Sequence, residues 1–232
     1  MKKILSALAM LLLALSAHAD GTILFSTAQG GIDVAPYRIP GIACGYGGRL
    51  IASVGRLVCG TDPGFGRVDC VVKISTDNGA TWSEREIEAA VGDASLINNV
   101  KTPMAAAYGD PAIVMDRESH EVLMMAVAGC TVYGYASTNR HNPNLIAAIR
   151  SMDGGQTWQQ PIEQTEAIYG LFDQTHPIDA AFVGGGKIFQ SRVVKVGRYY
   201  RIYAALTARP KGNRVIYSDD FGRTWAALGG PS

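Results

Sequence analysis

The sequence predicts an all-β protein, and three observations support that class. Glycine is abundant, with 27 residues among 232, while charged residues make up only 18% of the chain, a mixture that suits many tight turns. An eight-residue pattern typical of a turn between two strands occurs three times. Helical periodicity is absent beyond the first segment of the chain, whereas short β-capable runs recur throughout.

The first nineteen residues have the layout of a secretory signal peptide. Two lysines precede an apolar run, Ile4 to Leu15, and Ala17-His18-Ala19 supplies the small residues of a cleavage site. The run is short for a membrane span, and an uncleaved anchor fits the Ala-His-Ala site poorly. We therefore expect cleavage before Asp20, no transmembrane segment in residues 20–232, and export to the periplasm, the cell surface or the medium.

Composition excludes several classes of partner. The net charge of +1 gives no reason to expect nucleic acid or a polybasic membrane contact. The histidines of the mature chain are scattered and the cysteine spacing matches no zinc site, so we expect neither a metal nor a cofactor.

An oxidising compartment would permit disulfides among Cys44, Cys59, Cys70 and Cys130. Cys59 and Cys70 flank a glycine-rich loop and are the pair to test first, although buried free thiols fit equally well.

The repeated pattern reads S-x-D-x-G-x-T-W. Its physics is that of a hairpin turn: Asp accepts backbone N–H groups, Gly takes a positive φ, and Thr and Trp restart a strand. The copies span Ser75–Trp82, Ser151–Trp158 and Ser218–Trp225. They follow the β-rich segments Asp69–Ile74, Asn144–Ile149 and Asn213–Tyr217. Further β-capable runs are Arg49–Val54, Ala112–Met115, Glu121–Ala128, Lys187–Val196 and Tyr199–Leu206.

This pattern resembles the Asp box of bacterial sialidases and related β-propellers. The resemblance implies four-stranded blades with the box between the third and fourth strands, on the rim away from the substrate. Asp77, Asp153 and Asp220 are therefore expected to be structural turn residues. Their spacing exceeds one blade of about 40–50 residues, so some blades would lack the box or carry long loops. The family's ring has six blades, of which this chain would hold about the first three to four.

A second signature is Tyr37-Arg38-Ile39-Pro40. It matches the [FY]-R-I-P motif that opens sialidase catalytic domains, and it lies upstream of the first box as in that family. Sialic acid is a carboxylate, and arginine is a permanently charged fork that can bind a carboxylate with two hydrogen bonds. Pro40 restricts the preceding residue and helps to fix the strand. We expect Arg38 to hold the substrate carboxylate; the alternative is a surface arginine on an edge strand.

The same resemblance assigns two residues downstream. In these sialidases an arginine ends the second strand of the first blade, and an aspartate six residues later is the general acid/base. Arg56 and Asp62 stand in those places. A ketosidic bond needs a proton donor for the leaving oxygen and later a base for water. Asp62 could instead be a solvated loop carboxylate; a competing candidate, Asp69, is expected to be structural and embedded in a strand.

Asp110, in Tyr108-Gly109-Asp110-Pro111, resembles the aspartate of the second blade that reaches the acetamido group of the sugar. An ordinary turn role before Pro111 fits almost as well. The family's nucleophilic tyrosine, its activating glutamate and two further arginines all follow the third box. The last glutamate of this chain is Glu166, so the resemblance implies an N-terminal portion that is inactive alone.

The leading interpretation is a retaining exo-α-sialidase acting on sialylated glycoproteins, glycolipids or oligosaccharides, with Arg38, Arg56 and Asp110 at the glycan and Asp62 as acid/base. A second is a catalytically inactive propeller that binds sialylated glycans. A binder has no need of a proton donor, so Arg38 together with Asp62 favours the enzyme. A purely structural Asp-box propeller would leave the R-I-P motif unexplained.

Overall fold

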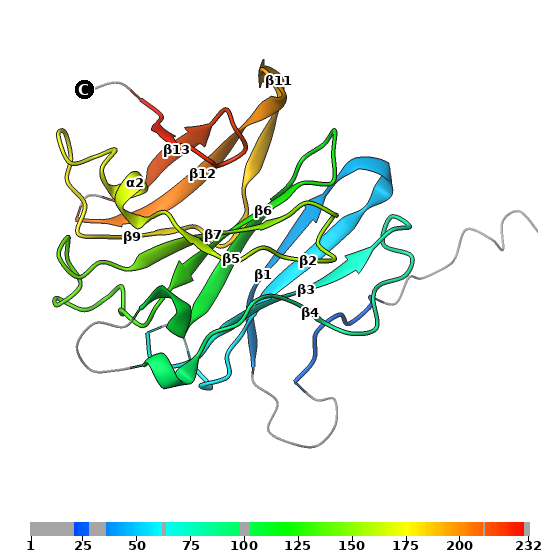
Figure 1. Ribbon diagram of the computed structural model, residues 1–232, viewed down its shortest axis with the longest axis horizontal. Helices are drawn as coiled ribbons and strands as arrows, with labels where there is room; N and C mark the ends of the chain where they lie inside the picture. The colour runs from blue at the N-terminus through cyan, green and yellow to red at the C-terminus, as the bar shows by residue number, and fades with distance from the viewer. Residues whose placement is uncertain (1–20, 28–35, 62–63, 98–102, 211, 230–232) are drawn as a thin grey trace, which may run out of the picture.

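A computed structural model of the chain describes residues 21–27, 36–61, 64–97, 103–210 and 212–229. The expected signal peptide, residues 1–19, lies outside the described residues, and so does Asp62. The described part is built almost wholly from strands, which form three sheets that follow one another along the chain (Figure 1). The all-β class is therefore confirmed.

The main part of each sheet is an antiparallel meander of four consecutive strands, as in a propeller blade, and sheets 2 and 3 each have a fifth strand. Sheet 1 consists of β1 (Tyr37–Cys44), β2 (Leu50–Arg56), β3 (Asp69–Ser75) and β4 (Ile87–Ala90). Sheet 2 consists of β5 (Tyr108–Met115), β6 (Val122–Ala128), β7 (Leu145–Ser151) and β8 (Ile162–Glu163). Sheet 3 consists of β11 (Phe189–Val196), β12 (Tyr199–Arg209), β13 (Arg214–Ser218) and β14 (Ala226–Ala227). Every β-capable run expected from the sequence overlaps one of these strands.

Three sheets are the lower end of the expected three to four blades. Each of them carries one S-x-D-x-G-x-T-W box, between its third and fourth strands. The wide spacing of the boxes therefore comes from long loops, and no described sheet lacks a box. The residues that the structure describes do not close a ring.

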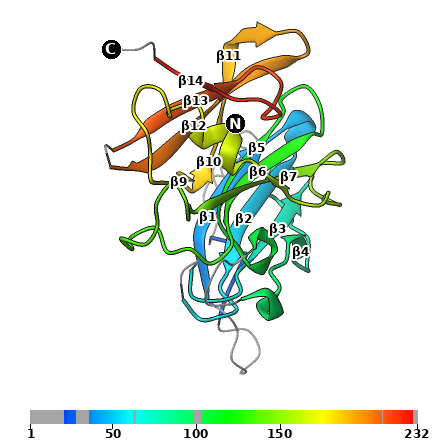
Figure 2. The ribbon, with the colours of Figure 1, turned by 60° about the vertical axis from the view of Figure 1, so that its left-hand side comes forward.

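The first strand of each sheet is called its inner strand, and in sheet 3 this inner edge is interrupted. β9 (Ala180–Val183) and β11 both pair with β12, and between them β10 (Gly186–Lys187) leaves the sheet to pair in parallel with β5 (Figure 2). Gly41 of β1 lies against β10: a Cβ at Gly41 would lie 2.2 Å from the carbonyl oxygen of Gly186. Only glycine allows the two backbones to approach so closely.

Short helical segments fill the connections. Among the described residues they are one α-helix, α2 (Thr165–Tyr169), and the 3-10 turns η1 (Tyr46–Gly48), η2 (Ala94–Leu96) and η3 (Met104–Ala106). The sequence did not predict α2, because five residues are too few to show helical periodicity. Tertiary packing holds it instead, since Ile168 and Tyr169 are fully buried in the core.

Two hydrophobic clusters lie between neighbouring sheets. Sheets 1 and 2 share a cluster that includes Ile51, Val72 and Met124, and sheets 2 and 3 share one that includes Leu123 and Ile202. The tryptophan of each later box belongs to the cluster that its sheet shares with the sheet before it: Trp158 packs on the first cluster and Trp225 lies in the second. The boxes thus join successive sheets.

Candidate functional site

The Asp boxes are turns closed by their aspartates. In the first box Asp77 accepts hydrogen bonds from the backbone N–H of Thr81 (2.8 Å) and from its hydroxyl (2.6 Å). The same two bonds recur at Asp153 and Asp220. These bonds lower the pKa of Asp77 to about 2. At Asp153 and Asp220 burial opposes ionisation, but the hydrogen bonds outweigh it and the pKa is again lowered.

Arg38 and Asp110 lie at the end of the sheets opposite to the boxes. Arg38 pairs with Gly55 near the start of β1, whereas the first box follows the far end of β3. A Cβ at Gly55 would lie 3.6 Å from the carbonyl oxygen of Arg38 and 3.8 Å from the backbone nitrogen of Asp110. The two predicted ligand-binding residues are therefore neighbours on adjacent inner strands.

Both inner strands are distorted at this point. The register of β1 shifts between Arg38 and Gly41, and that of β5 shifts just beside Asp110. The residue before proline has a left-handed backbone in both, with φ 53° at Ile39 and φ 50° at Asp110. Such conformations are unfavourable for non-glycine residues, more so before proline, and they concentrate at functional sites.

Asp110 lines a cavity of about 250 Å³ with mostly apolar walls. The walls come from the loop after β2, from the end of β6, from the loop after β6 and from β9; they include Phe65, Val127, Val132, Tyr133, Asn144 and Phe182. Tyr133 and Phe182 meet edge to face, with ring centroids 4.9 Å apart. A carboxylate in an apolar, aromatic pocket suits a ligand group that combines an N–H donor with a small apolar part.

Arg38 lines a different cavity. This second cavity, of about 370 Å³, lies between the start of sheet 1 and the segment Thr22–Phe25, and Tyr37 and Val54 also line it. The ring of Phe25 packs on Tyr37 with centroids 5.5 Å apart. The structure therefore places Arg38 and Asp110 side by side along the backbone but does not bring them into one cavity.

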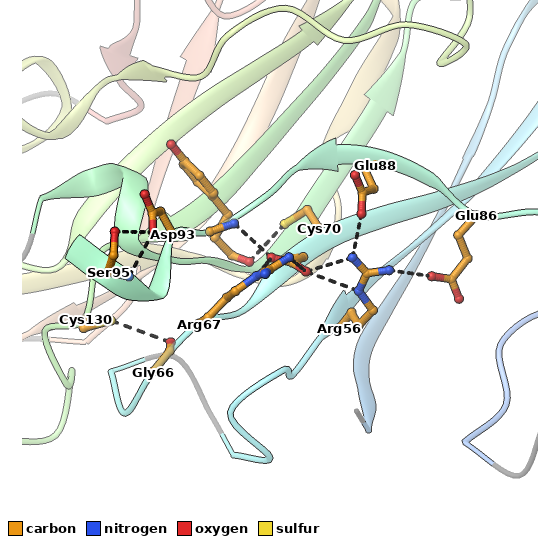
Figure 3. A network of polar contacts seen from close by, with 12 residues as sticks. Arg56, Gly66, Arg67, Cys70, Glu86, Glu88, Asp93, Ser95 and Cys130 are labelled. Atoms are coloured by element: carbon orange, nitrogen blue, oxygen red, sulfur yellow. Dashed lines mark hydrogen bonds and ion pairs between the residues drawn. The ribbon is translucent and has the colours of Figure 1, made fainter. Parts of the chain in front are cut away.

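Arg56 belongs to a cluster of charged side chains on sheet 1 (Figure 3). Arg56 pairs with Tyr37 of β1, so the two side chains share one face of the sheet. Its guanidinium donates to Asp69 (2.8 Å), to Glu86 (3.3 Å) and to Glu88 (2.8 Å). Each guanidinium nitrogen thereby has a carboxylate partner. The structure thus gives Arg56 a well-defined structural role and leaves its predicted contact with a glycan as a prediction.

Asp69 is the buried centre of that cluster. Its side chain is fully inaccessible and accepts hydrogen bonds from Arg56, from Arg67 (2.9 Å) and from the N–H of Gly92 (2.9 Å). Burial alone would raise the pKa of Asp69, but these donors outweigh it and the pKa is lowered. An aspartate that stays ionised cannot donate a proton near neutral pH, so Asp69 is unsuited to be the general acid.

The four cysteines are free thiols in the structure, so Cys59 and Cys70, the pair to test first, are not bonded. Cys70 is buried against the carbonyl of Tyr108, and burial raises its pKa, whereas Cys59 is exposed. Across the described ranges no three His, Cys, Asp or Glu side chains gather as a metal site. In the same ranges no helix has the length and apolarity needed to cross a membrane.

Sequence reasoning missed the walls of the Asp110 cavity. Phe65, Val132 and Tyr133 lie in loops, and Phe182 lies in a short strand. No periodic pattern connects them, and only the packing of sheet 2 between sheets 1 and 3 brings them together. Aromatic residues in loops near the Asp62 and Asp110 segments were the one available signal.

Comparison with known proteins gives matches to an Asp-box repeat and to a sialidase. A family model of the BNR/Asp-box repeat matches residues 73–84 and 216–227. A sialidase of Micromonospora viridifaciens is 29% identical over 200 residues, which are 82% of this chain and 28% of that protein. The chain carries Asp-box repeats and is similar in sequence to a bacterial sialidase.

Solved structures agree on the fold. The Hadza microbial sialidase Hz136 superposes with a TM-score of 0.65 at 24% identity over 83% of this chain and 37% of that one. An intramolecular trans-sialidase from Ruminococcus gnavus gives a TM-score of 0.66 at 14% identity over 91% of this chain and 64% of that one. The fold is thus of the sialidase β-propeller type, and the chain spans less than two thirds of these relatives.

Proposed function

We propose that this chain is the N-terminal part of an exported exo-α-sialidase, which removes terminal sialic acid from glycoproteins, glycolipids or oligosaccharides with retention of configuration. The observation that carries the proposal is that Arg38 and Asp110 lie side by side along the backbone of neighbouring inner strands, each at the wall of its own cavity. A sugar with one carboxylate and one acylated amine needs these two kinds of contact. The sialidase relative that aligns with 82% of the chain supports the choice of substrate.

Each contact follows from the chemistry of the side chain. Arg38 binds the sugar carboxylate through paired N–H donors, which a lysine could not reproduce. Asp110 accepts the amide N–H of the acylamino group, while Val132, Tyr133 and Phe182 enclose its methyl group. Arg56 keeps its predicted contact with the glycan, and its ion pairs fix the end of β2 next to Gly55.

The reaction needs a proton at the glycosidic oxygen. Asp62 donates it as general acid and then, as general base, removes a proton from the incoming water. The nucleophilic tyrosine, its glutamate and two more arginines would follow the third box in the longer protein, so we expect residues 20–232 alone to be inactive. Product analysis would separate hydrolysis, which releases free sialic acid, from intramolecular transfer, which yields an anhydro sugar.

The test uses the full exported protein with a fluorogenic sialoside. Asp62→Asn should lower kcat at least 100-fold, the scale of general acid catalysis, while binding of sialyllactose, followed by saturation-transfer NMR, is retained. Asp110→Asn should mainly raise KM, by about tenfold for one lost charged hydrogen bond. Glu84→Gln, at an exposed carboxylate just beyond the first box, is the matched control and should change neither.

The outcomes separate the candidate functions. Binding without hydrolysis, in both the wild type and Asp62→Asn, would identify a sialoglycan-binding propeller. Absence of both binding and hydrolysis would reject the site. Fluorophore release by purified residues 20–232 would contradict the expectation that the nucleophile lies further along the chain.

A further inference from the structure

Two loops pack against each other at the edge of the Asp110 cavity. One joins β2 to β3 and the other follows β6. A Cβ at Gly64 in the first loop would lie 2.5 Å from a methyl carbon of Val132 in the second. The rings of Phe65 and Tyr135 also meet edge to face, with centroids 6.3 Å apart. The loops therefore touch along two successive residues of the first loop, Gly64 and Phe65, which itself lines the cavity.

The same two loops bring two thiols to one residue, Gly66. The N–H of Cys59 donates to the carbonyl of Arg67 (3.0 Å), which folds the first loop back on itself. A Cβ at Gly66 would lie 2.5 Å from Cβ and 3.3 Å from Sγ of Cys59. Sγ of Cys130, from the second loop, lies 3.6 Å from the carbonyl oxygen of Gly66 (Figure 3). Sγ of Cys130 thus lies within 4 Å of a backbone atom of Gly66, and Sγ of Cys59 lies within 4 Å of the position that a Cβ on Gly66 would take.

Accessibility and electrostatics also fit a thiol pair. Cys59 is exposed, so an oxidant can reach it, whereas Cys130 is half-buried. Burial raises the pKa of Cys130, and the nearby Cys59 raises it further, as expected of two groups that would repel as thiolates. Cys59 is therefore the thiol that reacts first.

The other two cysteines are poorly placed. Cys70 is sealed in the core between sheets 1 and 2 and contacts the carbonyl of Tyr108. Cys44 ends β1 and pairs with Leu50, at the end of sheet 1 remote from Cys59. Of the four thiols, only Cys59 and Cys130 are accessible and at the same end of the sheets.

We propose that Cys59 and Cys130 form an intrachain disulfide that ties the loop after β2 to the loop after β6 at the mouth of the Asp110 cavity. A disulfide requires Cα atoms about 4.4–6.8 Å apart, so the two loops, already in contact through Gly64 and Val132, must make a closing movement to form it. Gly66 leaves room for this movement, because any side chain there would collide with Cys59. The pairing does not depend on the proposed sialidase activity.

The bond forms by thiol–disulfide exchange with an oxidised dithiol protein or with oxidised glutathione. The Cys59 thiolate attacks one sulfur of that disulfide and releases the other as a thiolate. The Cys130 thiolate then attacks Cys59 in the mixed disulfide and releases the second. One disulfide forms and one is reduced, and the two protons lost by the cysteines end on the two thiols released.

The direct test maps the cysteines of the full exported protein, purified without reductant and alkylated while unfolding. Trypsin separates all four cysteines, because they fall in the fragments 39–49, 57–67, 68–73 and 118–140. We expect fragments 57–67 and 118–140 to be joined, with a mass about 2 Da below their sum because two hydrogens are lost, and to separate on reduction. Fragments 39–49 and 68–73 should be alkylated singly.

Thermal melting provides the second measurement. Reductant should lower the melting temperature of the wild type by on the order of 5–10 °C, because the bond closes a long loop. Cys59→Ser and Cys130→Ser should each melt with the reduced wild type and ignore reductant, whereas the control Cys44→Ser should behave as the wild type.

Alkylation of both Cys59 and Cys130 in the exported protein, even after incubation with oxidised glutathione, would overturn the proposal. So would a link from Cys59 to Cys70. These results come from the wild-type chain, so they hold even if a serine variant fails to fold.

Discussion

The two box tryptophans in the core should respond in opposite ways to replacement by phenylalanine. Trp158 is half-buried, and its indole N–H donates to the carbonyl of Gly155 (2.9 Å). Trp225 is 9% exposed, and its buried indole N–H has no hydrogen-bond partner among the described residues. Phenylalanine keeps an aromatic ring in both places and removes both N–H groups.

The expected magnitudes follow from these contacts. At Trp225 the smaller ring loses about 1 kcal/mol of apolar burial, but it removes an unsatisfied buried donor that costs about 1–3 kcal/mol. Trp225→Phe should therefore lie between neutral and about 2 kcal/mol stabilising. Trp158→Phe loses less area but breaks a hydrogen bond and leaves the Gly155 carbonyl without its donor, so it should destabilise by about 1–2 kcal/mol.

Urea unfolding followed by far-UV circular dichroism measures both free energies of unfolding without relying on tryptophan fluorescence. Trp82→Phe is the matched control, because Trp82 of the first box is half-buried and outside both core clusters. It should change stability by less than about 1 kcal/mol. If Trp225→Phe destabilised the protein as much as Trp158→Phe, ring burial and not the N–H would govern these sites, and the reasoning would be refuted.

Three further predictions concern charge and close packing. Folding lowers the pKa of Asp77 to about 2, from about 4 in the unfolded chain, so the stability that its ionised carboxylate contributes is complete above pH 4 and is lost as the pH falls to 2. Asp77→Asn should therefore reduce the fall of the melting temperature between pH 4 and pH 2. An unchanged slope of melting temperature against pH would contradict this. Asp69→Asn should destabilise by about 3–5 kcal/mol by leaving two arginines without their buried partner, whereas Glu88→Gln, 54% exposed, should cost under about 1 kcal/mol in the same urea assay. Gly41→Ala should destabilise by about 1–3 kcal/mol because its methyl group would overlap the Gly186 carbonyl, and Gly21→Ala, with open space around it, should melt as the wild type.

The sheets could be predicted from the sequence because their signals are local. A box such as Ser151–Trp158 contains every partner of its own turn: Asp153 bonds Thr157, and Ser151 bonds both Asp153 and Gly155. Such contacts need no knowledge of the rest of the chain. The same holds for the R-I-P segment, whose bulge at Ile39 lies beside a proline that the sequence shows.

The charged and apolar surroundings of the site could not be predicted in this way. From the sequence Arg56 is expected at the glycan, and nothing there shows that strand pairing across sheet 1 also brings it to Asp69 and to Glu88, which are 13 and 32 residues away. The Asp110 cavity likewise depends on Phe65 and Phe182, which lie in different sheets or their loops. Spacing in the sequence cannot show which long-range partners already occupy a side chain.

The architecture separates stability from recognition along each strand. At one end the boxes close turns and, through Trp158 and Trp225, fasten each sheet to the sheet before it. At the other end the inner strands of sheets 1 and 2 bulge before proline at Ile39 and Asp110. Strained backbone persists only where its surroundings hold it, and the packing of whole sheets supplies that hold. Substitutions at the boxes should therefore change the free energy of unfolding and leave ligand affinity unchanged in the folded protein, whereas Asp110→Asn should do the reverse.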